Sequence, residues 1–486
     1  MKTCSALLLT FLLSLPCFAD APYLGTGIKI GEVSDHDARV WVRLTKTEKR
    51  VGFEVPMPSV KYFDLKTGAL FTERRPRFGR PELTYPDGLN IDTIQGAVPG
   101  SLGVVRVQYG LTESDATKKT PWHKVNTEDD FTTQFHLKDL QANAEYRIRV
   151  ECKASEDNDI LTATMEGSFK TAPKLNQQVP VSFAVSTGQD YRHLDSPKGY
   201  RLYDSILAKA PNFFVHTGDI LYYDERAKNE ALARWHWQRT YSLPSNVNFH
   251  RQVSSYFMKD DHDTLVNDCW PTMDAPMMGD LTFKQGLKIF REQVPMGKKT
   301  YRTVRWGKDL QIWMVEGRDF RSANTMPDGP EKTIWGAEQL AWFKRTVEAS
   351  DATFRILISP TPVVGPDREG KNDNHANEGF AYEGNLLREF LATQKNIYVV
   401  CGDRHWQYVS VDQTHGVREY SCGPASIEHA QGWTNDMIRP EHQYLNVTGG
   451  FLTITVDRDA DDHPTLSARH YSVFGKLLNE DIQVAH

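Results

Sequence analysis

The sequence lacks any apolar run long enough to cross a bilayer, because no segment after residue 19 approaches the roughly 20 apolar residues of a transmembrane helix. It also lacks a basic tract. The 57 Lys and Arg residues are outnumbered by 63 Asp and Glu residues, which leaves a formal net charge of −6 spread over the chain. This mild, dispersed charge argues against nucleic acid as a partner. No internal repeat and no low-complexity segment is visible.

Cysteine is scarce as well. Four cysteines lie beyond residue 19, and they are Cys152, Cys269, Cys401 and Cys422. Their spacing matches no zinc motif, and four cysteines in so long a chain do not indicate a disulfide scaffold. One bridge would be compatible with an oxidising compartment, and the spacing favours no particular pair.

The N-terminus has the pattern of a secretory signal peptide. Lys2 supplies the positive charge, and residues 6–15 are almost unbroken apolar sequence. Small residues precede the junction after Ala19, so residues 1–19 are predicted to be a cleaved signal peptide. Pro16 stands before Cys17, which argues against a lipoprotein, and no twin arginine precedes the apolar run. We therefore expect a secreted or periplasmic protein that acquires any metal outside the cytoplasm.

The remaining chain is too long for one compact core, so two domains are expected. Residues 24–173 alternate apolar and polar side chains with the period of strands. Residues 131–150 have the strand–corner–strand pattern of an immunoglobulin-like or fibronectin III-like sandwich. Residues 55–102 are rich in Pro and Gly and read as an insertion into this sandwich.

From residue 180 to 486, short apolar runs alternate with amphipathic helical stretches, which is the order of an α/β domain. The helix predicted over 335–349 places Leu340, Phe343 and Val347 on one face. The predicted strands are 179–186, 213–216, 255–259, 310–315, 354–359 and 397–401.

Three of these strands run directly into carboxylate and imidazole side chains. The segments are Gly218-Asp219 with Tyr222, Asp260-Asp261-His262-Asp263, and Gly402-Asp403-Arg404-His405. In an open α/β sheet, ligands bind beyond the carboxyl ends of the strands. Oxygen and imidazole groups that meet there suit hard or borderline metal ions. Each segment alone is compatible with a turn or a solvated loop, but the three together predict a metal centre.

The order Gly-Asp-x-x-Tyr, Asp-Asp-His-Asp and Gly-Asp-x-His resembles the alkaline phosphatase D-like branch of the calcineurin-like metallophosphoesterases. The segments 316–321 and 335–339 agree with it, and the similarity extends from Gly27 to the C-terminus apart from the insertion. The resemblance implies an α/β metallophosphoesterase sandwich of two mixed β-sheets flanked by helices. It also implies an all-β immunoglobulin- or fibronectin III-like domain ahead of that sandwich.

The resemblance further implies roles for the matching residues. Asp219 would join two metals, and Tyr222 would be a phenolate ligand. Asp261 would bind the second metal, and His262 beside it would donate a proton or contact phosphate. The last ligand pair would be Asp403 and His405. Such enzymes typically combine iron with calcium.

One ligand departs from this pattern. The family's first strand usually ends in Ser-Cys-Gln, whose thiolate binds iron, whereas Gly188 stands at the cysteine position here. Either Asp190 or Gln189 reaches in from the next positions, or a water fills the gap. Without a soft thiolate, the expected cofactors are two or more divalent ions among Ca, Mn, Mg and Zn, with iron left open.

The chemistry expected of such a site is phosphate ester hydrolysis. Metal ions polarise the phosphoryl oxygens and make hydroxide available near neutral pH. Arg318 and Arg404 are predicted to hold the non-bridging oxygens, since a guanidinium offers two parallel donors. For Arg318, a structural salt bridge to Glu316 or Asp319 is an equally good interpretation.

The leading hypothesis is a metal-dependent phosphatase or phosphodiesterase acting on a small or polymeric phosphate ester. Two alternatives stay open. One is a secreted binding protein that has lost catalysis and uses its sandwich, which Gly188 favours. The other is a hydrolase of another ester, such as a sulfate or a carboxylate. Retention of the acidic and imidazole residues argues against the binding protein, because burying them without partners is costly.

Overall fold

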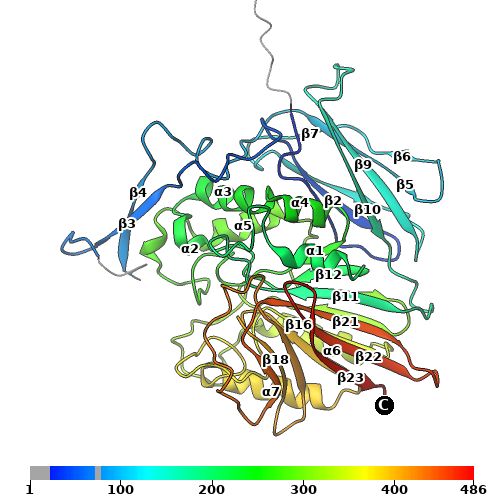
Figure 1. Ribbon diagram of the computed structural model, residues 1–486. Helices are drawn as coiled ribbons and strands as arrows, with labels where there is room; N and C mark the ends of the chain where they lie inside the picture. Colours follow the sequence, from blue (N-terminus) through cyan, green and yellow to red (C-terminus); the bar gives the residue numbers. More distant parts are fainter. Residues whose placement is uncertain (1–21, 72–77) are drawn as a thin grey trace, which may run out of the picture.

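The computed structural model describes residues 22–71 and 78–486 (Figure 1). The signal peptide predicted at residues 1–19 lies outside these residues. In the described ranges, no helix is both long enough and apolar enough to cross a membrane. The cysteines at 152, 269, 401 and 422 are all buried and all free.

The first of two large mixed sheets has nine strands in the described part of the chain, in the order β23-β22-β21-β11-β12-β13-β1-β2-β8. Their bounds are β23 Leu477–Val484, β22 Pro464–Ser472, β21 Gly450–Arg458, β11 Val181–Ser186, β12 Phe213–His216, β13 Ser255–Phe257, β1 Ile28–Gly31, β2 Ala38–Arg43 and β8 Thr132–Leu137. Strands β11, β12 and β13 are parallel neighbours. Their carboxyl ends therefore lie at one edge.

The second sheet has seven strands within the described residues, in the order β14-β15-β16-β17-β19-β18-β20. Their bounds are β14 Arg302–Trp306, β15 Leu310–Met314, β16 Phe354–Ser359, β17 Ile397–Cys401, β19 Arg418–Cys422, β18 Gln407–Val411 and β20 His442–Asn446. Strands β15, β16, β17 and β19 run parallel. All six strands predicted from residue 179 onward are therefore present, three of them shorter by one or two residues.

The two sheets pack face to face over one apolar core. Alternate side chains of each sheet point into it, including Phe183, Val215, Ile312 and Ile356, all fully or almost fully buried. Helices α6 (Gly336–Glu348) and α7 (Ala381–Ala392) cover the outer face of the seven-stranded sheet. Helices α1 (Arg201–Leu207) and α4 (Pro244–His250) cover the nine-stranded sheet. The expected sandwich of two mixed sheets flanked by helices is confirmed.

The N-terminal half is all-β in its described part and is joined to the sandwich. A separate sheet, β10-β9-β5-β6 with β7 paired to β5, packs on β1, β2 and β8 around a second core. Its strands are β5 Val104–Leu111, β6 Lys118–Lys119, β7 His123–Lys124, β9 Glu145–Lys153 and β10 Ala163–Lys170. Since β1 pairs in parallel with β13, this half continues the nine-stranded sheet. An immunoglobulin or fibronectin III topology stays a prediction, as do the domain boundaries at 173 and 180.

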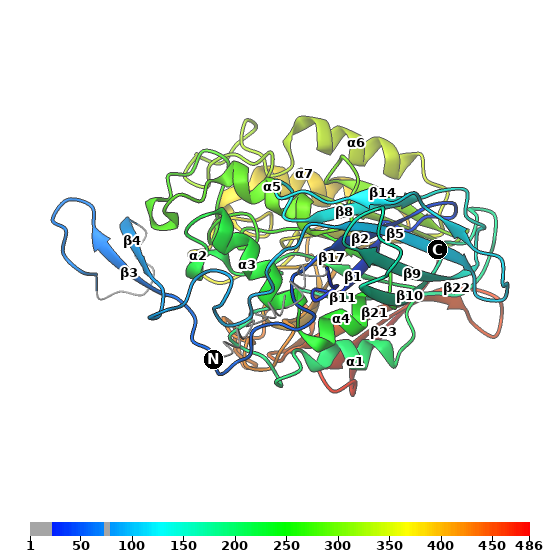
Figure 2. The same cartoon turned by 90° about the horizontal axis from the view of Figure 1, so that it is seen from above.

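The predicted insertion at 55–102 contains a hairpin of β3 (Ser59–Asp64) and β4 (Gly79–Thr84), which stands out from one side of the molecule (Figure 2). At its base, Tyr62 packs in one apolar cluster with Ile220 and Leu221. The Arg226 side chain also donates to the carbonyl of Pro58 at 3.0 Å. The insertion therefore supports the loop that follows β12.

Candidate metal centre

The polar segments that follow β11, β12, β13 and β17 meet at one edge of the sandwich. Residue 188 lies beside the loop after β12, where the Gln189 amide donates to the carbonyl of Asp219 at 2.7 Å. A second close approach between loops occurs at Gly218, whose φ is +111°. A Cβ there would lie 2.8 Å from the backbone nitrogen of Asp260, so only glycine lets these two loops touch.

Asp219 is at the centre of this meeting point. Its φ of +54° is rare for a residue with a side chain, and the side chain is buried. One of its carboxylate oxygens, Oδ1, has no hydrogen-bond partner. Burial, and then the nearby carboxylates of Asp261 and Asp260, raise the pKa of Asp219 well above its usual value, against an opposing effect of His262. A cation at this carboxylate would offset both the cost of burying it and the repulsion from the neighbouring carboxylates.

Two further predicted ligands lie on one side of Asp219. The Tyr222 hydroxyl is 3.4 Å from Asp219 Oδ2 and 3.4 Å from His405 Nε2. His405 Nε2 is 3.7 Å from the same oxygen of Asp219. Burial lowers the pKa of His405 well below its usual value, so the ring is neutral and able to act as a ligand. The structure thus brings together residues separated by 186 positions in sequence.

Asp261 and His262 lie on another side. One ligand atom from each of Asp219, Asp261 and His262 falls within 4.8 Å of the other two. Both oxygens of Asp261 accept backbone amides, at 2.9 Å from His262 and 2.5 Å from Asp268, which fixes the orientation of the carboxylate. The Asp219 carboxylate is therefore close to both groups of candidate ligands.

The His262 ring is held next to carboxylates. Its Nδ1 lies 3.2 Å from Asp224 Oδ1, and its ring centroid is 4.4 Å from that of Tyr222. Burial opposes the charged form, but the carboxylates of Asp224, Asp261 and Asp219 outweigh it and raise the pKa of His262 well above its usual value. These carboxylates favour the charged form of the ring, which can donate a proton.

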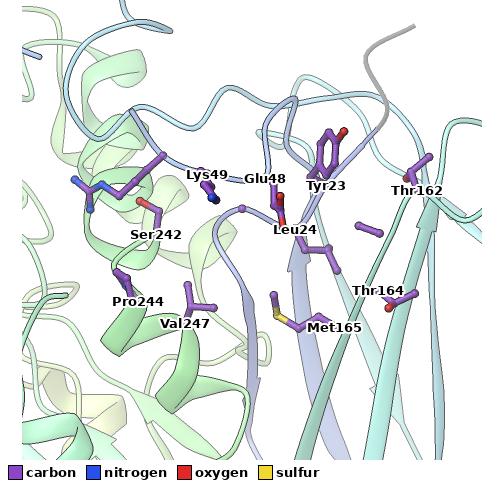
Figure 3. Close-up of a pocket in the computed structure, with 13 residues that line it drawn as sticks. Tyr23, Leu24, Glu48, Lys49, Thr162, Thr164, Met165, Ser242, Pro244 and Val247 are labelled. Atoms are coloured by element: carbon purple, nitrogen blue, oxygen red, sulfur yellow. The ribbon is translucent and has the colours of Figure 1, made fainter. Parts of the chain in front are cut away.

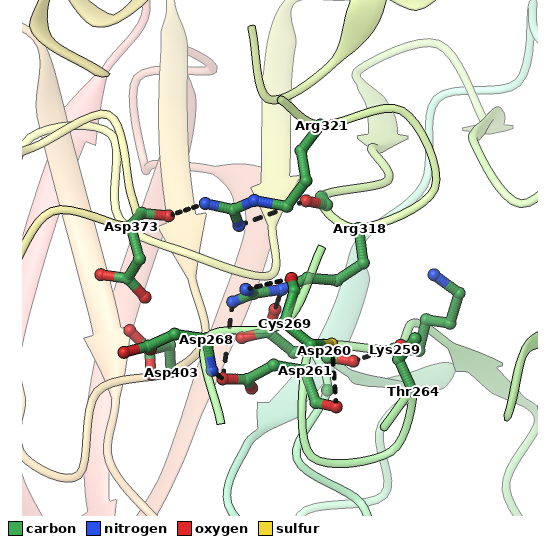
Figure 4. Close-up of polar contacts among 12 residues, drawn as sticks. Lys259, Asp260, Asp261, Thr264, Asp268, Cys269, Arg318, Arg321, Asp373 and Asp403 are labelled. Carbon is green, nitrogen blue, oxygen red and sulfur yellow. Dashed lines mark hydrogen bonds and ion pairs between the residues drawn. The ribbon is translucent and has the colours of Figure 1, made fainter. Parts of the chain in front are cut away.

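Asp403, from the loop after β17, lies near the carboxylates of Asp261 and Asp373 (Figure 4). It adopts a φ of +61° and contacts Arg404 at 3.0 Å. Burial, partly offset by Arg404, raises the pKa of Asp403. A third, partly buried carboxylate near Asp219 and Asp261 increases the negative charge that a cation would neutralise.

The two predicted phosphate-binding arginines are both fully buried and face carboxylates of the protein. Arg318 Nε contacts Asp260 Oδ1 at 2.5 Å, and one terminal nitrogen donates to the carbonyl of Cys269 at 3.3 Å (Figure 4). Arg404 contacts Asp367 at 2.7 Å. The salt bridge considered for Arg318 is thus formed with Asp260, whereas Glu316 pairs with Lys259. A phosphate contact for either arginine stays a prediction.

Neither residue proposed to compensate for Gly188 has a free side chain. Asp190 is buried, and its carboxylate accepts from Arg192 at 2.5 Å. The Gln189 carbonyl oxygen accepts from Tyr203, and from Asn246 at 3.2 Å. A metal-binding role for Asp190 stays a prediction, although its oxygen lies within 4.8 Å of ring nitrogens of His193 and His429.

Sequence reasoning missed His429. This buried residue follows β19, a strand that the sequence analysis did not identify. Its Nε2 is 3.1 Å from the Tyr222 hydroxyl, and its ring centroid is 4.1 Å from that of His405. Burial lowers the pKa of His429 to about 4, so the ring is neutral. The available signal was weak: a short alternating stretch, 420–422, followed by Gly423-Pro424 a few residues before the histidine.

These residues fit divalent metal ions. The unpartnered oxygen of Asp219, the raised pKa values of Asp219 and Asp403, and the neutral rings of His405 and His429 form a buried set with excess negative charge and open lone pairs. Carboxylate, phenolate and imidazole donors are those that divalent metal ions use.

A separate cavity of about 680 Å³ lies between the N-terminal strands and α4 (Figure 3). Its lining includes Tyr23, Glu48, Lys49, Met165 and Val247. None of the candidate ligands described above is among its lining residues. The cavity is therefore not part of the metal centre.

Comparison with known proteins agrees with this geometry. The PhoD-like phosphatase family matches residues 183–435, a range that contains every candidate ligand. The solved structure titled "Structure of PhoD" superposes with a TM-score of 0.68 at 15% identity, covering 97% of this chain and 90% of that one. A purple acid phosphatase, PPD1, from yellow lupin (Lupinus luteus) seeds gives 0.61 at 12% identity, covering 94% of this chain and 73% of that one. No curated protein sequence matches significantly. The chain belongs to the PhoD-like phosphatase family and is a metal-dependent phosphoesterase.

Proposed function

We propose that this protein hydrolyses phosphomonoesters or phosphodiesters outside the cytoplasm at the centre built around Asp219. The observation that carries the proposal is the buried, partly unpartnered carboxylate of Asp219 close to several donors. Tyr222, His405 and Asp261 each bring a donor atom within 4.8 Å of it. Asp403 adds a further carboxylate beside Asp261.

In this proposal Asp219, Tyr222, His405, Asp261 and Asp403 would hold divalent ions. When bound, such ions polarise the phosphoryl oxygens and provide hydroxide near neutral pH. The chain itself orients these donors. The backbone amides that clamp Asp261 and the positive φ of Asp219 and Asp403 hold the carboxylates in place before substrate arrives.

His262 is proposed to protonate the leaving oxygen. Its ring retains 9% exposure at the edge of the centre, and the carboxylates around it favour the charged ring. Asp224 at 3.2 Å keeps Nδ1 oriented, which leaves Nε2 for substrate. General acid catalysis by a positioned imidazolium contributes about 10²–10⁴-fold to such a step.

Arg318 and Arg404 have a second role that their contacts support. Arg318 holds Asp260, the neighbour of Asp261, and Arg404 contacts Asp403. Arg404 thereby positions the proposed ligand Asp403, and a terminal nitrogen of Arg318 lies 3.8 Å from Oδ2 of the proposed ligand Asp261.

Export is the remaining part of the proposal, and the pattern at residues 1–19 supports it. The mature protein is expected to begin at Asp20. N-terminal sequencing of protein recovered from the medium or the periplasm tests this. An intact N-terminus in the cytoplasmic fraction would contradict it.

The catalytic proposal is tested on purified protein with three substrates: a nitrophenyl phosphate monoester, a nitrophenyl phosphate diester and a nitrophenyl sulfate. We expect bound divalent metal, hydrolysis of a phosphate ester, and loss of activity after chelation that metal restores. The variant Asp219→Asn should lose metal-dependent turnover, whereas Asp351→Asn, whose side chain is 82% exposed, should not. Full activity of Asp219→Asn, or cleavage of the sulfate ester alone, would contradict the proposal.

A further inference from the structure

Gly188 leaves a position beside the metal centre without a side chain. Its φ is +58°, and an ideal Cβ there would lie 3.4 Å from His405 Cδ2 and 3.5 Å from His405 Nε2. Any side chain at residue 188 would therefore start next to a candidate ligand atom. Glycine supplies no donor at this point, so a ligand would have to come from another segment.

His429 enters this region from the loop after β19. The loop is tied to residue 188 by two contacts, because the Ala425 amide donates to the Gly188 carbonyl at 3.1 Å and His429 Nδ1 lies 2.9 Å from the same oxygen. A carbonyl oxygen can only accept, so Nδ1 carries the proton. The neutral ring then has its lone pair on Nε2, which points at Tyr222. A ring whose second nitrogen donates to a backbone carbonyl is the usual arrangement of a metal-binding histidine.

The spacing of the donor atoms supports the same assignment. The Tyr222 hydroxyl is 3.1 Å from His429 Nε2, 3.4 Å from His405 Nε2 and 3.4 Å from Asp219 Oδ2. His405 Nε2 and Asp219 Oδ2 are 3.7 Å apart. The Tyr222 hydroxyl thus lies within 3.4 Å of a donor atom from each of the other three residues.

We propose that His429 is a metal ligand, and that Asp219, Tyr222, His405 and His429 form one site. The inference rests on the proposed function, and it specifies the ligands on the Tyr222 side of the metal centre. Two imidazoles with a phenolate and a carboxylate suit a first-row transition ion such as Zn²⁺ or Co²⁺, whereas Ca²⁺ and Mg²⁺ prefer oxygen donors. Gly188 contributes its carbonyl, which orients the His429 ring.

His193 provides a matched control. It lies near His429, with ring centroids 5.3 Å apart, and belongs to the other nearby group of possible ligands with Asp190. Its side chain is 26% exposed, and its Nδ1 is 3.3 Å from Asp190 Oδ2. Since Asp190 is already paired with Arg192, we assign His429 to the Tyr222 side.

The test uses full-length metal-free protein titrated with Co²⁺, with the visible absorption spectrum as the readout. Wild type should give the intense bands of a four- or five-coordinate ion. His429→Ala and His429→Gln should bind at least about 10-fold more weakly at this site, the loss that even an outer-shell partner causes. Their bands should weaken or disappear. His193→Ala should match wild type, and the melting temperatures of the metal-free proteins show whether each variant folds.

A second readout is the proton NMR spectrum of the Co²⁺ protein. Each coordinated histidine gives one strongly shifted, exchangeable N–H resonance, so wild type should show a signal from His429 that His429→Gln lacks. Unchanged Co²⁺ affinity and spectrum in folded His429→Gln would overturn the inference while leaving the proposed function intact. Wild-type protein that binds no metal and cleaves no phosphate ester would instead overturn the proposed function.

Discussion

Arg318 could position a carboxylate of the protein or bind the phosphate of the substrate, and the change Arg318→Leu distinguishes these two roles. Its Nε lies 2.5 Å from Asp260 Oδ1, and both side chains are completely buried. The variant would leave the Asp260 carboxylate without its main partner and the Cys269 carbonyl without a donor. We therefore expect the main effect on stability and on the metal site.

The magnitude follows from this burial. Removing one partner of a buried ion pair costs about 3–5 kcal/mol. With an unfolding entropy of about 2.1 cal/mol/K per residue and a cooperative unit of roughly 300 residues, this loss lowers the melting temperature by about 5–8 °C. Burial already raises the pKa of Asp260, and loss of Arg318 would raise it further. The charged carboxylate is therefore most costly at high pH, and the loss should grow as pH rises.

The assay is thermal unfolding of wild type and variant across a pH series, with the inhibition constant of inorganic phosphate measured in parallel. Arg469→Leu is the control, because Arg469 and Glu480 form a partly exposed pair on β22 and β23, with side chains 30% and 39% exposed. Such a pair contributes about 0–1 kcal/mol. An unchanged melting temperature in Arg318→Leu, together with a large rise in the phosphate inhibition constant, would refute the positioning argument.

Two further outcomes are expected. His262→Gln should lower kcat by about 10²–10⁴-fold for phenyl phosphate but much less for p-nitrophenyl phosphate, whose leaving group needs little protonation, as steady-state kinetics on both esters will show. Equal losses on the two esters would contradict a role in protonating the leaving group. Lys259→Met should cost about 3–5 kcal/mol of stability, since Lys259 is buried between Glu316 at 2.6 Å and Asp319 at 2.7 Å. Lys299→Met, at an exposed lysine, should leave the denaturation midpoint unchanged, and equal shifts in the two variants would show that burial of the pair is not the cause.

Local sequence patterns were sufficient for the central strands. Strands β11, β12, β16 and β17 are buried on both faces, so each appears as a short apolar run with sharp polar ends. Strand β19 was missed because Arg418 and Glu419 interrupt its apolar pattern. In the fold Glu419 is buried, and it accepts amides from Val363 and Val364, two contacts that local sequence does not indicate. His429 was missed together with its strand.

Long-range pairing could not be predicted from the sequence either. The parallel contact of β1 with β13 joins Gly31 to Ser255, and no periodicity in either strand indicates its partner. The partners of the arginines could not be predicted from the sequence either. A guanidinium after a strand suits a phosphate or a carboxylate equally well, and only packing showed that Arg318 and Arg404 face Asp260 and Asp367.

The sequence by itself determined that carboxylates and imidazoles follow buried strands at 219, 261, 403 and 405, because the change from apolar to acidic residues is local and direct. Tertiary structure decided which of those groups touch, which arginines are buried against carboxylates, and that His429 approaches Tyr222 beside a glycine. The physical reason is distance along the chain. Donor atoms 3–4 Å apart in space come from residues up to 207 positions apart, and only the packing of two sheets brings them together.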